Sequence, residues 1–453
     1  MGQLSFTFMQ TVAFHTLGCK LNFTETASLA RQFASRGYHV VDIDKPADVI
    51  VLNTCSVTER ADRECRQFVR RALRTSPGAY VIVVGCYAQL RPDVLSSISG
   101  VDLVLGTKEK FEIFSHAKWQ KTSDAQVRVS PIREAVDVLP SSSAGYADRT
   151  RAFLKIQDGC DYTCSFCTIP LARGSSRSIA LSHLLTEARS IVAEGYKEIV
   201  LTGVNVGDYG KNIGSSLVEA LKAIAEIEGL ERLRVSSVEP NLLSDDLLEF
   251  WTGSPTLCKH FHIPLQSGAD ATLAGMRRRY RRSWYADRLA AIRKRAPLAG
   301  IGADVIVGFP GETKAHFEET YAFLVEQPLT YLHVFTYSER PNTPAASFGG
   351  KIPPELKAER SERLRMLSRK KRHIFHESLK GKTLDVLFEE SGERETGLSD
   401  EYVRVSVASA RRLTNQILPV VITESGDEEC YGSLQEDSNP QANLRPIPLE
   451  ADV

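Results

Sequence analysis

The sequence lacks an excess of charge of either sign and lacks long apolar runs. Its 453 residues include 56 Lys and Arg against 56 Asp and Glu, so the formal net charge is zero. A balanced charge argues against a uniformly basic nucleic-acid coat and leaves room only for local basic patches. No stretch approaches the roughly 20 apolar residues that cross a bilayer, and the N-terminus has no basic segment ahead of an apolar one. We therefore expect neither a membrane partner nor a secretory signal.

Cysteine is scarce and odd in number. The nine cysteines of this long chain do not form the dense, even framework of a small disulfide-bonded domain. A reducing cytoplasm is the better interpretation, in which the thiols remain available as metal ligands. The length suggests about three domains, and the composition is that of ordinary globular proteins.

Strands and helices alternate at the start of the chain. Short buried-type apolar runs and stretches with helical spacing predict an open parallel α/β sheet, to which we assign residues 11–125. A weakly patterned stretch follows, ending in Pro140 and a run of serines, and it predicts a linker over 126–148. The predicted strands are 12–16, 49–53 and 80–84, and the predicted helices are 23–36 and 58–75.

A second alternation begins near Arg151. Six strand-and-helix repeats over about 200 residues predict a full or partial (β/α) barrel, to which we assign residues 149–375. Short β-rich runs then predict a small all-β barrel over 376–446, with a frayed polar tail after Gln435. The fold class is therefore multidomain α/β with a C-terminal β-barrel. The predicted elements are strands 152–156, 198–202, 232–237, 260–263, 302–307 and 331–336, a helix at 354–379, and β-rich runs at 383–388, 402–407 and 417–423.

Three cysteines share one short loop, in the segment DGCDYTCSFCTIP. Cys160, Cys164 and Cys167 have C-x3-C-x2-C spacing and follow the first predicted strand of the barrel. Three thiolates on a tight loop can bind three irons of a [4Fe–4S] cluster and leave the fourth iron open to a small molecule. A zinc loop is the alternative, but structural zinc needs a fourth ligand, and no fourth Cys or His completes the set locally.

Three further cysteines each stand just past the end of a predicted strand. Cys19 follows VAFHTLG, Cys55 follows VIVLNT and Cys86 follows YVIVVG. Open α/β sheets bind ligands at the carboxyl ends of their strands, so these thiols converge if the strands are neighbours. Gly18 and Gly85 would allow the backbone to approach a bulky cluster closely. Buried core cysteines are the alternative, but the repetition at three strand ends favours a second [4Fe–4S] cluster.

The motifs around these cysteines resemble those of a known enzyme family. The C-x3-C-x2-C loop with Phe166 before its last cysteine is similar to the signature of radical S-adenosylmethionine (SAM) enzymes. TLGCKLN, NTC, GCYAQ, SSVEP, HIPLQSG and ADVIVGFPGET resemble the methylthiotransferase family through nearly the whole chain, and the C-terminal part resembles a TRAM domain. Lys20 after the first cysteine resembles the MtaB type. The isopentenyladenosine enzymes favour Gln at that place, and the ribosomal-protein enzymes favour Pro.

The resemblance implies radical chemistry on two [4Fe–4S] clusters. The cluster on the C-x3-C-x2-C loop would bind SAM, and one electron would cleave it to methionine and a 5′-deoxyadenosyl radical. The radical would take a hydrogen from C2 of the adenine at position 37 of tRNA, and the other cluster would carry the sulfur. A second SAM would supply the methyl group by polar transfer. For the MtaB type, the substrate would be N6-threonylcarbamoyladenosine, giving its 2-methylthio derivative.

The resemblance also implies which side chains surround SAM. Phe166 would pack near the adenine, and the other candidates follow the ends of predicted strands, where barrel active sites collect. The alternatives are a solvated charge or helix-cap partner for Glu239, a loop hydrogen bond for Gln266, and ordinary turns for the glycines. The candidates are Phe166, Thr202, Gly203, Asn205, Glu239, Gln266, Ser267 and Gly308.

Two local basic clusters interrupt the balanced charge. MRRRYRR contains five arginines around one tyrosine, and residues 360–372 carry seven Lys and Arg on a predicted helix. Arginines that contact phosphates supply RNA affinity, and an aromatic among them can stack an unpaired base. The second cluster is equally consistent with a solvated helix face whose charges pair with glutamates. The candidate RNA-binding residues are Arg277, Arg278, Arg279, Tyr280, Arg281 and Arg282.

This chemistry predicts a set of partners for a cytoplasmic monomer. We expect the anticodon loop of tRNA and an electron donor such as flavodoxin or ferredoxin; the sequence does not identify the sulfur donor. One alternative is the same chemistry on isopentenyladenosine at position 37 of tRNA or on a ribosomal-protein aspartate. An alternative of another class is an RNA-binding protein whose metal centres are structural.

Overall fold

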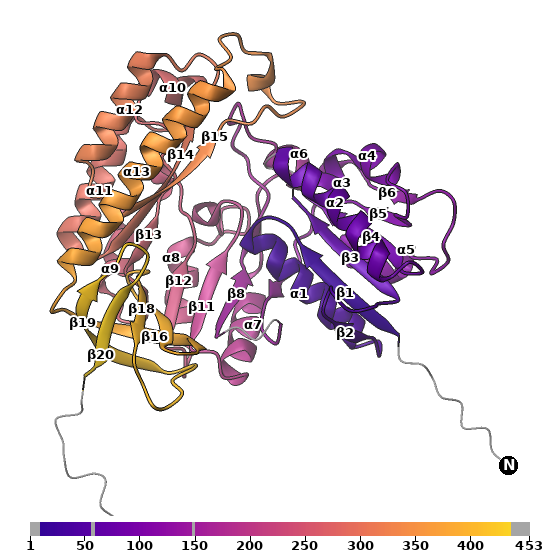
Figure 1. Cartoon of the computed structure of the whole chain (residues 1–453), viewed down its shortest axis with the longest axis horizontal. Helices are drawn as coiled ribbons and strands as arrows, with labels where there is room; N and C mark the ends of the chain where they lie inside the picture. The colour runs from indigo at the N-terminus through magenta and orange to yellow at the C-terminus, as the bar shows by residue number, and fades with distance from the viewer. Residues whose placement is uncertain (1–9, 56–58, 147–149, 436–453) are drawn as a thin grey trace, which may run out of the picture. The chain divides into compact units, whose positions relative to one another are not determined.

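The computed structural model describes residues 10–55, 59–146 and 150–435 (Figure 1). Three parts of the predictions lie outside the described residues. They are the first residue of the predicted helix 58–75, the last two residues of the predicted linker 126–148, and everything predicted beyond residue 435. The chain divides into two compact units, with the boundary between Arg372 and His373. The domain limits inside the first unit stay predictions. No helix in the described ranges is long and apolar enough to cross a membrane.

The first unit begins with a parallel sheet in the order β2-β1-β3-β4-β5-β6. β3 and β4 are buried along their whole length, which explains why they are continuous apolar runs rather than alternating ones. The three predicted strands are confirmed, whereas β2, β5 and β6 are too short to show a period. The elements are β1 (Thr11–Thr16), α1 (Lys20–Ala34), β2 (His39–Val41), β3 (Val49–Thr54), α2 (Glu59–Thr75), β4 (Tyr80–Gly85), α3 (Cys86–Leu90), α4 (Pro92–Ser96), β5 (Leu103–Leu105), η1 (Glu109–Phe111), α5 (Ile113–His116), β6 (Gln126–Arg128) and η2 (Ile132–Glu134).

The middle of the first unit is an open barrel of parallel strands. The ladders β8-β11-β12 and β13-β14-β15 are joined by isolated parallel bridges, Leu233 to Leu257 and Ser237 to His262. Within the described ranges no ladder links β8 to β15, and the antiparallel β7 covers the free edge of β8. The prediction of a full or partial barrel therefore resolves to a partial one. The strands are β7 (Ser141–Ser142), β8 (Arg151–Lys155), β9 (Gln157–Asp158), β10 (Arg177–Ser178), β11 (Glu198–Thr202), β12 (Arg232–Val235), β13 (His260–His262), β14 (Gly300–Val307) and β15 (Tyr331–Thr336).

Helices alternate with these strands, and one large apolar core lies between the two layers. Local sequence sets where several of them begin. Ser216 and Glu219 form a capping box at the start of α8, and the Thr313 hydroxyl accepts a hydrogen bond from the backbone of the first turn of α12. The helices are α6 (Ile169–Arg173), α7 (Leu181–Ala193), α8 (Leu217–Ala225), α9 (Asp245–Gly253), α10 (Asp270–Gly275), α11 (Arg282–Arg295), α12 (Lys314–Glu326) and α13 (Pro354–Ser378), with short turns η3 (Val206–Asp208), η4 (Pro240–Leu242) and η5 (Pro344–Ser347).

The second unit contains a closed barrel in the order β16-β17-β18-β20-β19. Its interior is filled by apolar side chains such as Val386, Phe388 and Val405, each with no exposed surface. This barrel confirms the predicted all-β architecture of the C-terminal part. The strands are β16 (Thr383–Ser391), β17 (Glu395–Ser399), β18 (Arg404–Val407), β19 (Ile417–Ser425) and β20 (Cys430–Leu434).

Candidate functional site

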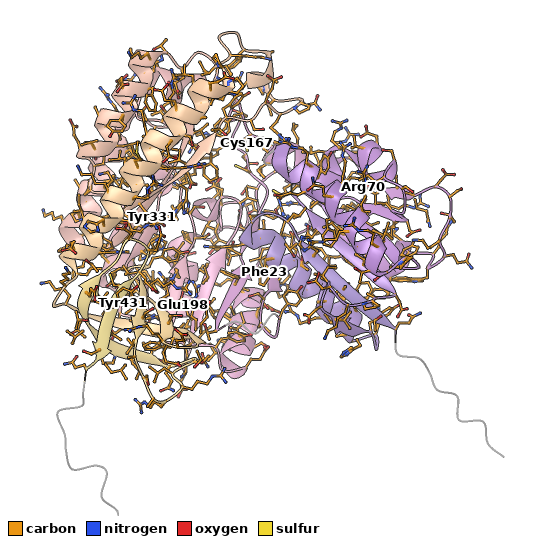
Figure 2. The ribbon with its side chains drawn as sticks, in the orientation of Figure 1. Phe23, Arg70, Cys167, Glu198, Tyr331 and Tyr431 are labelled. Carbon is orange, nitrogen blue, oxygen red and sulfur yellow. The ribbon has the colours of Figure 1, made fainter. Side chains whose placement is uncertain are left out.

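The loop between β9 and α6 carries Cys160, Cys164 and Cys167, the last of which is labelled in Figure 2. Burial and the neighbouring Cys164 thiol raise the pKa of Cys160 to about 11, and burial with both neighbours raises the pKa of Cys167 to about 12. Each of these thiols accepts a hydrogen bond from the backbone two residues further on. Three mutually close thiols that stay protonated on their own form a donor set that suits a cationic metal centre, which displaces the protons.

The second set of cysteines lies at one edge of the N-terminal sheet. β1, β3 and β4 are consecutive neighbours, so the three loops that follow them start side by side. Cys55 directly follows β3, Cys86 begins the helix after β4, and Cys19 precedes α1. The backbone of Gly18 is so near that a β-carbon there would lie 2.8 Å from Cys55 Sγ. Burial raises the pKa of Cys86, and the Cys19 thiol adds to the rise. The structure thus brings the three predicted ligands together.

Arg173 connects the two groups of cysteines. It is the last residue of α6, the helix that directly follows the Cys160–Cys167 loop, and its side chain is 2% exposed. The guanidinium Nε donates to Cys86 Sγ at 3.2 Å. A fixed guanidinium beside a thiol favours the thiolate form that binds iron. The arrangement places Cys86 against the helix that follows the Cys160–Cys167 loop.

A buried charge network holds this arginine. Glu25 of α1 accepts hydrogen bonds from Arg173 at 2.9 and 3.1 Å and from Lys155 at 3.0 Å, and Lys110 Nζ lies 2.7 Å away. Asp158 accepts from Arg173 at 3.0 Å. Burial alone would raise the pKa of Glu25, but the surrounding cations, Arg173 first, hold it well below its ordinary value. With Arg177 4.0 Å from Asp158, four cations face two carboxylates, and an anionic metal–thiolate group at Cys86 would balance part of the positive excess.

A second arginine lies against the other triad. The Arg278 side chain is 3% exposed; it donates to Cys164 Sγ at 3.2 Å and forms an ion pair with Glu239. Burial raises the pKa of Glu239, and Arg278 opposes that rise. Glu239 is half-buried and forms an ion pair with Arg278 beside Cys164. Its side chain makes no hydrogen bond that caps η4, the turn that follows it.

Two of the six predicted RNA-binding residues are placed differently by the structure. Arg278 faces the cysteine loop, and Tyr280 is buried, with its hydroxyl donating to the carbonyl groups of Pro264 and Leu265 at 2.9 and 2.6 Å. A buried ring cannot stack an RNA base, so the prediction for Tyr280 is wrong. Arg277, directly before Arg278, adopts a left-handed backbone conformation with φ of +58°.

The remaining arginines of the cluster lie nearer the surface. Arg277 and Arg281 are exposed. Arg279 lies 3.9 Å above the centre of the Tyr162 ring, and Arg282 pairs with Glu319 at 2.6 Å. RNA binding by these four stays a prediction. In the second cluster, Arg360 and Arg363 pair with Glu312 and Glu318 outside the helix, and Arg369 pairs with Glu362 within it. The alternative of a solvated helix face with i,i+4 pairs to Glu355, Glu359 and Glu362 stays a prediction.

A pocket of about 250 Å³ adjoins the cysteine loop. Phe166 and Gln266, both predicted to surround SAM, line it beside Cys167. Gln266 has φ of +70°, a strained conformation for a residue with a side chain, and its backbone bridges to β14. The other lining residues are Thr168, Ile169, Asp304, Ile306, Phe335, Thr336, Tyr337, Ser338 and Arg340.

The loop after β11 is organised by Gln157. Its side-chain oxygen accepts hydrogen bonds from the backbone of Val204 and Asn205 at 3.0 and 2.8 Å. A β-carbon at Gly203 would lie 3.0 Å from that oxygen, so the close approach suits glycine. The Asn205 amide donates to Asp208, while its buried oxygen has no hydrogen-bond partner among the described residues.

The other three candidates have local structural contacts. The Thr202 carbonyl accepts a hydrogen bond from the backbone of Ile156 at 2.9 Å. The Ser267 hydroxyl hydrogen-bonds to Thr320 at 3.1 Å and does not line the pocket. Gly308, with φ of +75°, donates its backbone N–H to the Glu312 carboxylate at 3.1 Å. The sequence-based prediction missed Arg173 and Glu25. Arg173 lies in the same motif as the cysteine loop, which could have indicated it, whereas Glu25 lies in none of the motifs.

Comparisons with known proteins agree with this architecture. The model of the Radical SAM superfamily matches residues 154–324, and that of the Uncharacterized protein family UPF0004 matches residues 11–106. The threonylcarbamoyladenosine tRNA methylthiotransferase MtaB of Bacillus subtilis (strain 168) is 38% identical over 427 residues, covering 92% of this chain and 95% of that protein. The tRNA-2-methylthio-N(6)-dimethylallyladenosine synthase of Parafrankia sp. (strain EAN1pec) is 38% identical over 360 residues, covering 78% and 72%. The radical S-adenosylmethionine methyltransferase TsrM from Kitasatospora setae has a similar fold, with a TM-score of 0.56 at 16% identity over 74% of this chain and 77% of that one.

Proposed function

Because this chain belongs to the MtaB type of the radical SAM methylthiotransferase family, we propose that it adds a methylthio group to C2 of N6-threonylcarbamoyladenosine at position 37 of tRNA. The observation that carries the proposal is the convergence of Cys19, Cys55 and Cys86 at one sheet edge, in contact with the helix that follows the Cys160–Cys167 loop.

We propose that the thiols of Cys160, Cys164 and Cys167 hold a [4Fe–4S] cluster. When bound, such a cluster supplies the electron that cleaves SAM and an open iron that chelates its amino-acid end. The raised pKa values of Cys160 and Cys167 mean that loading releases protons and that the unloaded loop stays neutral. Arg278 donates to Cys164 Sγ and stabilises the thiolate, while Glu239 keeps the arginine in place.

We propose that Cys19, Cys55 and Cys86 hold a second [4Fe–4S] cluster, which when bound carries the sulfur that is transferred. The residual positive charge of the Arg173 network supports an anionic group here, since an unbalanced buried charge is costly. Arg173 orients Cys86 through its hydrogen bond. Because Arg173 belongs to α6, which follows the Cys160–Cys167 loop, it also fixes the distance between the two sets of ligands. Two SAM molecules per turnover follow from the two roles of SAM, radical source and methyl donor.

Of the eight predicted SAM-binding residues, Glu239 is proposed to hold Arg278, and geometry narrows the proposed roles of the other seven. Phe166 and Gln266 are proposed to contact the adenine from the pocket beside Cys167. Asn205 is proposed to contact the ribose or amino-acid end, because its buried oxygen has no partner among the described residues. Thr202, Gly203, Ser267 and Gly308 are proposed to shape the backbone of the site, since their contacts are within the chain.

The substrate and the redox partner are proposed from the family. Arg277, Arg279, Arg281 and Arg282 are proposed to contact tRNA phosphates near the anticodon loop. The electron is proposed to come from a small donor such as flavodoxin or ferredoxin. The alignment with the MtaB relative extends over nearly both chains, which favours the threonylcarbamoyl substrate over the dimethylallyl one.

The test is mass spectrometry of tRNA nucleosides from cells with and without this gene. We expect 2-methylthio-N6-threonylcarbamoyladenosine to be lost and its unmethylthiolated precursor to accumulate. The match to the dimethylallyladenosine synthase supports a second candidate with the same chemistry on isopentenyladenosine. Loss of the methylthio derivative of isopentenyladenosine, with the threonylcarbamoyl product unchanged, would refute the proposed substrate.

A further inference from the structure

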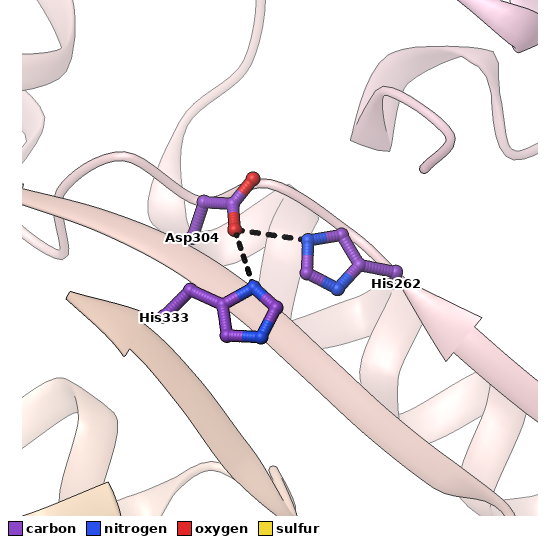
Figure 3. A group of neighbouring side chains, drawn as sticks. All are labelled: His262, Asp304 and His333. Carbon is purple, nitrogen blue, oxygen red and sulfur yellow. Dashed lines mark hydrogen bonds and ion pairs between the residues drawn. The ribbon is translucent and has the colours of Figure 1, made fainter. Parts of the chain in front are cut away.

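Three side chains from neighbouring strands meet at one carboxylate oxygen inside the open barrel (Figure 3). His262 Nε2 lies 3.0 Å and His333 Nδ1 lies 3.3 Å from Oδ1 of Asp304. The strand register produces the group, because Asp304 is the pairing partner of His333 in the β14–β15 ladder. His262 ends β13 on the other side of β14. None of the predicted cluster ligands belongs to this group.

The group forms a wall continuous with the pocket beside Cys167. Asp304 itself lines that pocket, as does Ile306, two residues further along the same face of β14. Phe335 lines the pocket and lies two residues beyond His333 on the same face of β15. Leu332, which precedes His333 and points to the opposite face of β15, is buried. His333 therefore faces the same interior as the pocket.

Of the two histidines, only His333 keeps a ring nitrogen without a hydrogen-bond partner among the described residues. His262 hydrogen-bonds through both ring nitrogens, to Asp304 and to the Tyr331 hydroxyl at 3.2 Å. His333 bonds to Asp304 through Nδ1, and its side chain is 53% exposed. In the described chain its Nε2 has no hydrogen bond. Hydrogen bonds from the two histidines outweigh burial and hold the pKa of Asp304 well below its ordinary value, so an ionised carboxylate lies beside His333.

We propose that His333, held by Asp304, binds the carboxylate of the threonyl group of the substrate through Nε2–H. This inference rests on the proposed function, which supplies a substrate with a carboxylate beyond N6 that is ionised at neutral pH. An imidazolium that donates to a carboxylate makes a charge-assisted hydrogen bond, and a dimethylallyl group offers no such partner. His333 is thus a specificity-determining residue, and it selects the acidic side chain on N6.

The experiment compares two anticodon stem-loop RNAs that differ in one group. One carries N6-threonylcarbamoyladenosine at position 37, and the other carries the same nucleoside with the threonine carboxylate converted to the amide. Methylthiolation of each is measured with the reconstituted, reduced enzyme as wild type, His333→Gln and His183→Gln. Glutamine keeps polarity but cannot carry charge, and His183 is an exposed histidine on α7 that serves as the matched control. Iron content is matched between the three proteins.

We expect His333→Gln to raise KM for the carboxylate RNA by about 10- to 100-fold, the usual strength of a hydrogen bond to a charged group. We expect little change for the amide RNA, and no change on either RNA for His183→Gln. An equal loss on both RNAs overturns the proposal, because it indicates a structural role. A third bound metal in wild type that His333→Gln lacks, found by elemental analysis, also overturns it in favour of a cation site. If wild type does not modify the carboxylate RNA at all, the proposed function itself fails.

Discussion

Glu25 is the residue on which the junction between the two cysteine groups depends most. It is fully buried in α1 and accepts from Arg173, Lys155 and Lys110, all of whose side chains are 2% exposed. Glu25→Gln keeps the volume and removes the charge, which leaves Asp158 as the remaining carboxylate for the buried cations, Arg177 included. Removing one partner of a buried ion pair costs about 3–5 kcal/mol. Asp158 and the Cys86 site still offset part of the positive charge. We therefore expect the free energy of unfolding to fall by an amount near the lower end of that range.

The assay is urea denaturation of anaerobically prepared protein at matched iron content, followed by far-UV circular dichroism. For a slope of about 3 kcal/mol/M, a loss of about 3 kcal/mol lowers the midpoint by about 1 M. Glu231→Gln is the control, since Glu231 pairs with Lys197 at the surface with 44% and 38% of the side chains exposed. An exposed pair contributes at most about 1 kcal/mol. We therefore expect the control to shift the midpoint far less.

The pH dependence gives a second check on the same residue. The folded-state pKa of Glu25 is lowered from 4.5, so its contribution to stability is complete above that value and is lost as the pH falls below it. The difference between wild type and Glu25→Gln should stay constant from about pH 8 to about pH 5.5 and shrink in more acidic solution. A Glu25→Gln protein as stable as wild type, or a difference that grows on acidification, would refute the reasoning.

Two further predictions concern the auxiliary cysteines. Cys19→Ala should still form 5′-deoxyadenosine from SAM with a reductant but should not insert sulfur, since only the second cluster is damaged; loss of SAM cleavage in a folded protein loaded at the first cluster would contradict the division of labour. Gly18→Ala should lose about half of the iron, because its β-carbon would lie 2.6 Å from that of Cys55, whereas Gly37→Ala shares the positive φ without any atom within 4 Å and should keep it. Iron content is measured after reconstitution. Equal iron in the two glycine variants would contradict the prediction, because it would show that the close approach to Cys55 does not decide iron binding.

Much of the fold could be predicted from the period of apolar residues. β3, β4 and β11 are fully buried strands with continuous apolar runs, and their predicted and observed limits differ by at most one residue. The convergence of the cysteines followed from the same pattern, because the carboxyl ends of parallel neighbours meet at one edge. Strands of three residues, such as β5 and β6, are too short to carry a period and were missed.

Contacts between distant segments could not be predicted in this way. Arg173 and Glu25 are separated by 148 positions, and neither has a neighbour in sequence that indicates the pairing. The run MRRRYRR was predicted to be an RNA-binding surface because five arginines are clustered in it. In the structure, the side chains of Arg278 and Tyr280 are instead buried. The His262, Asp304 and His333 group depends on the register of three strands, which no single motif reports.

The most direct test of the account is the iron content of three anaerobically reconstituted proteins. These are wild type, the variant with Cys19, Cys55 and Cys86 replaced by alanine, and the variant with Cys160, Cys164 and Cys167 replaced by alanine. Two separate [4Fe–4S] sites predict about eight irons in wild type and about four in each variant. A wild-type protein that saturates at about four irons, or a variant without Cys19, Cys55 and Cys86 that still binds about eight, would contradict it.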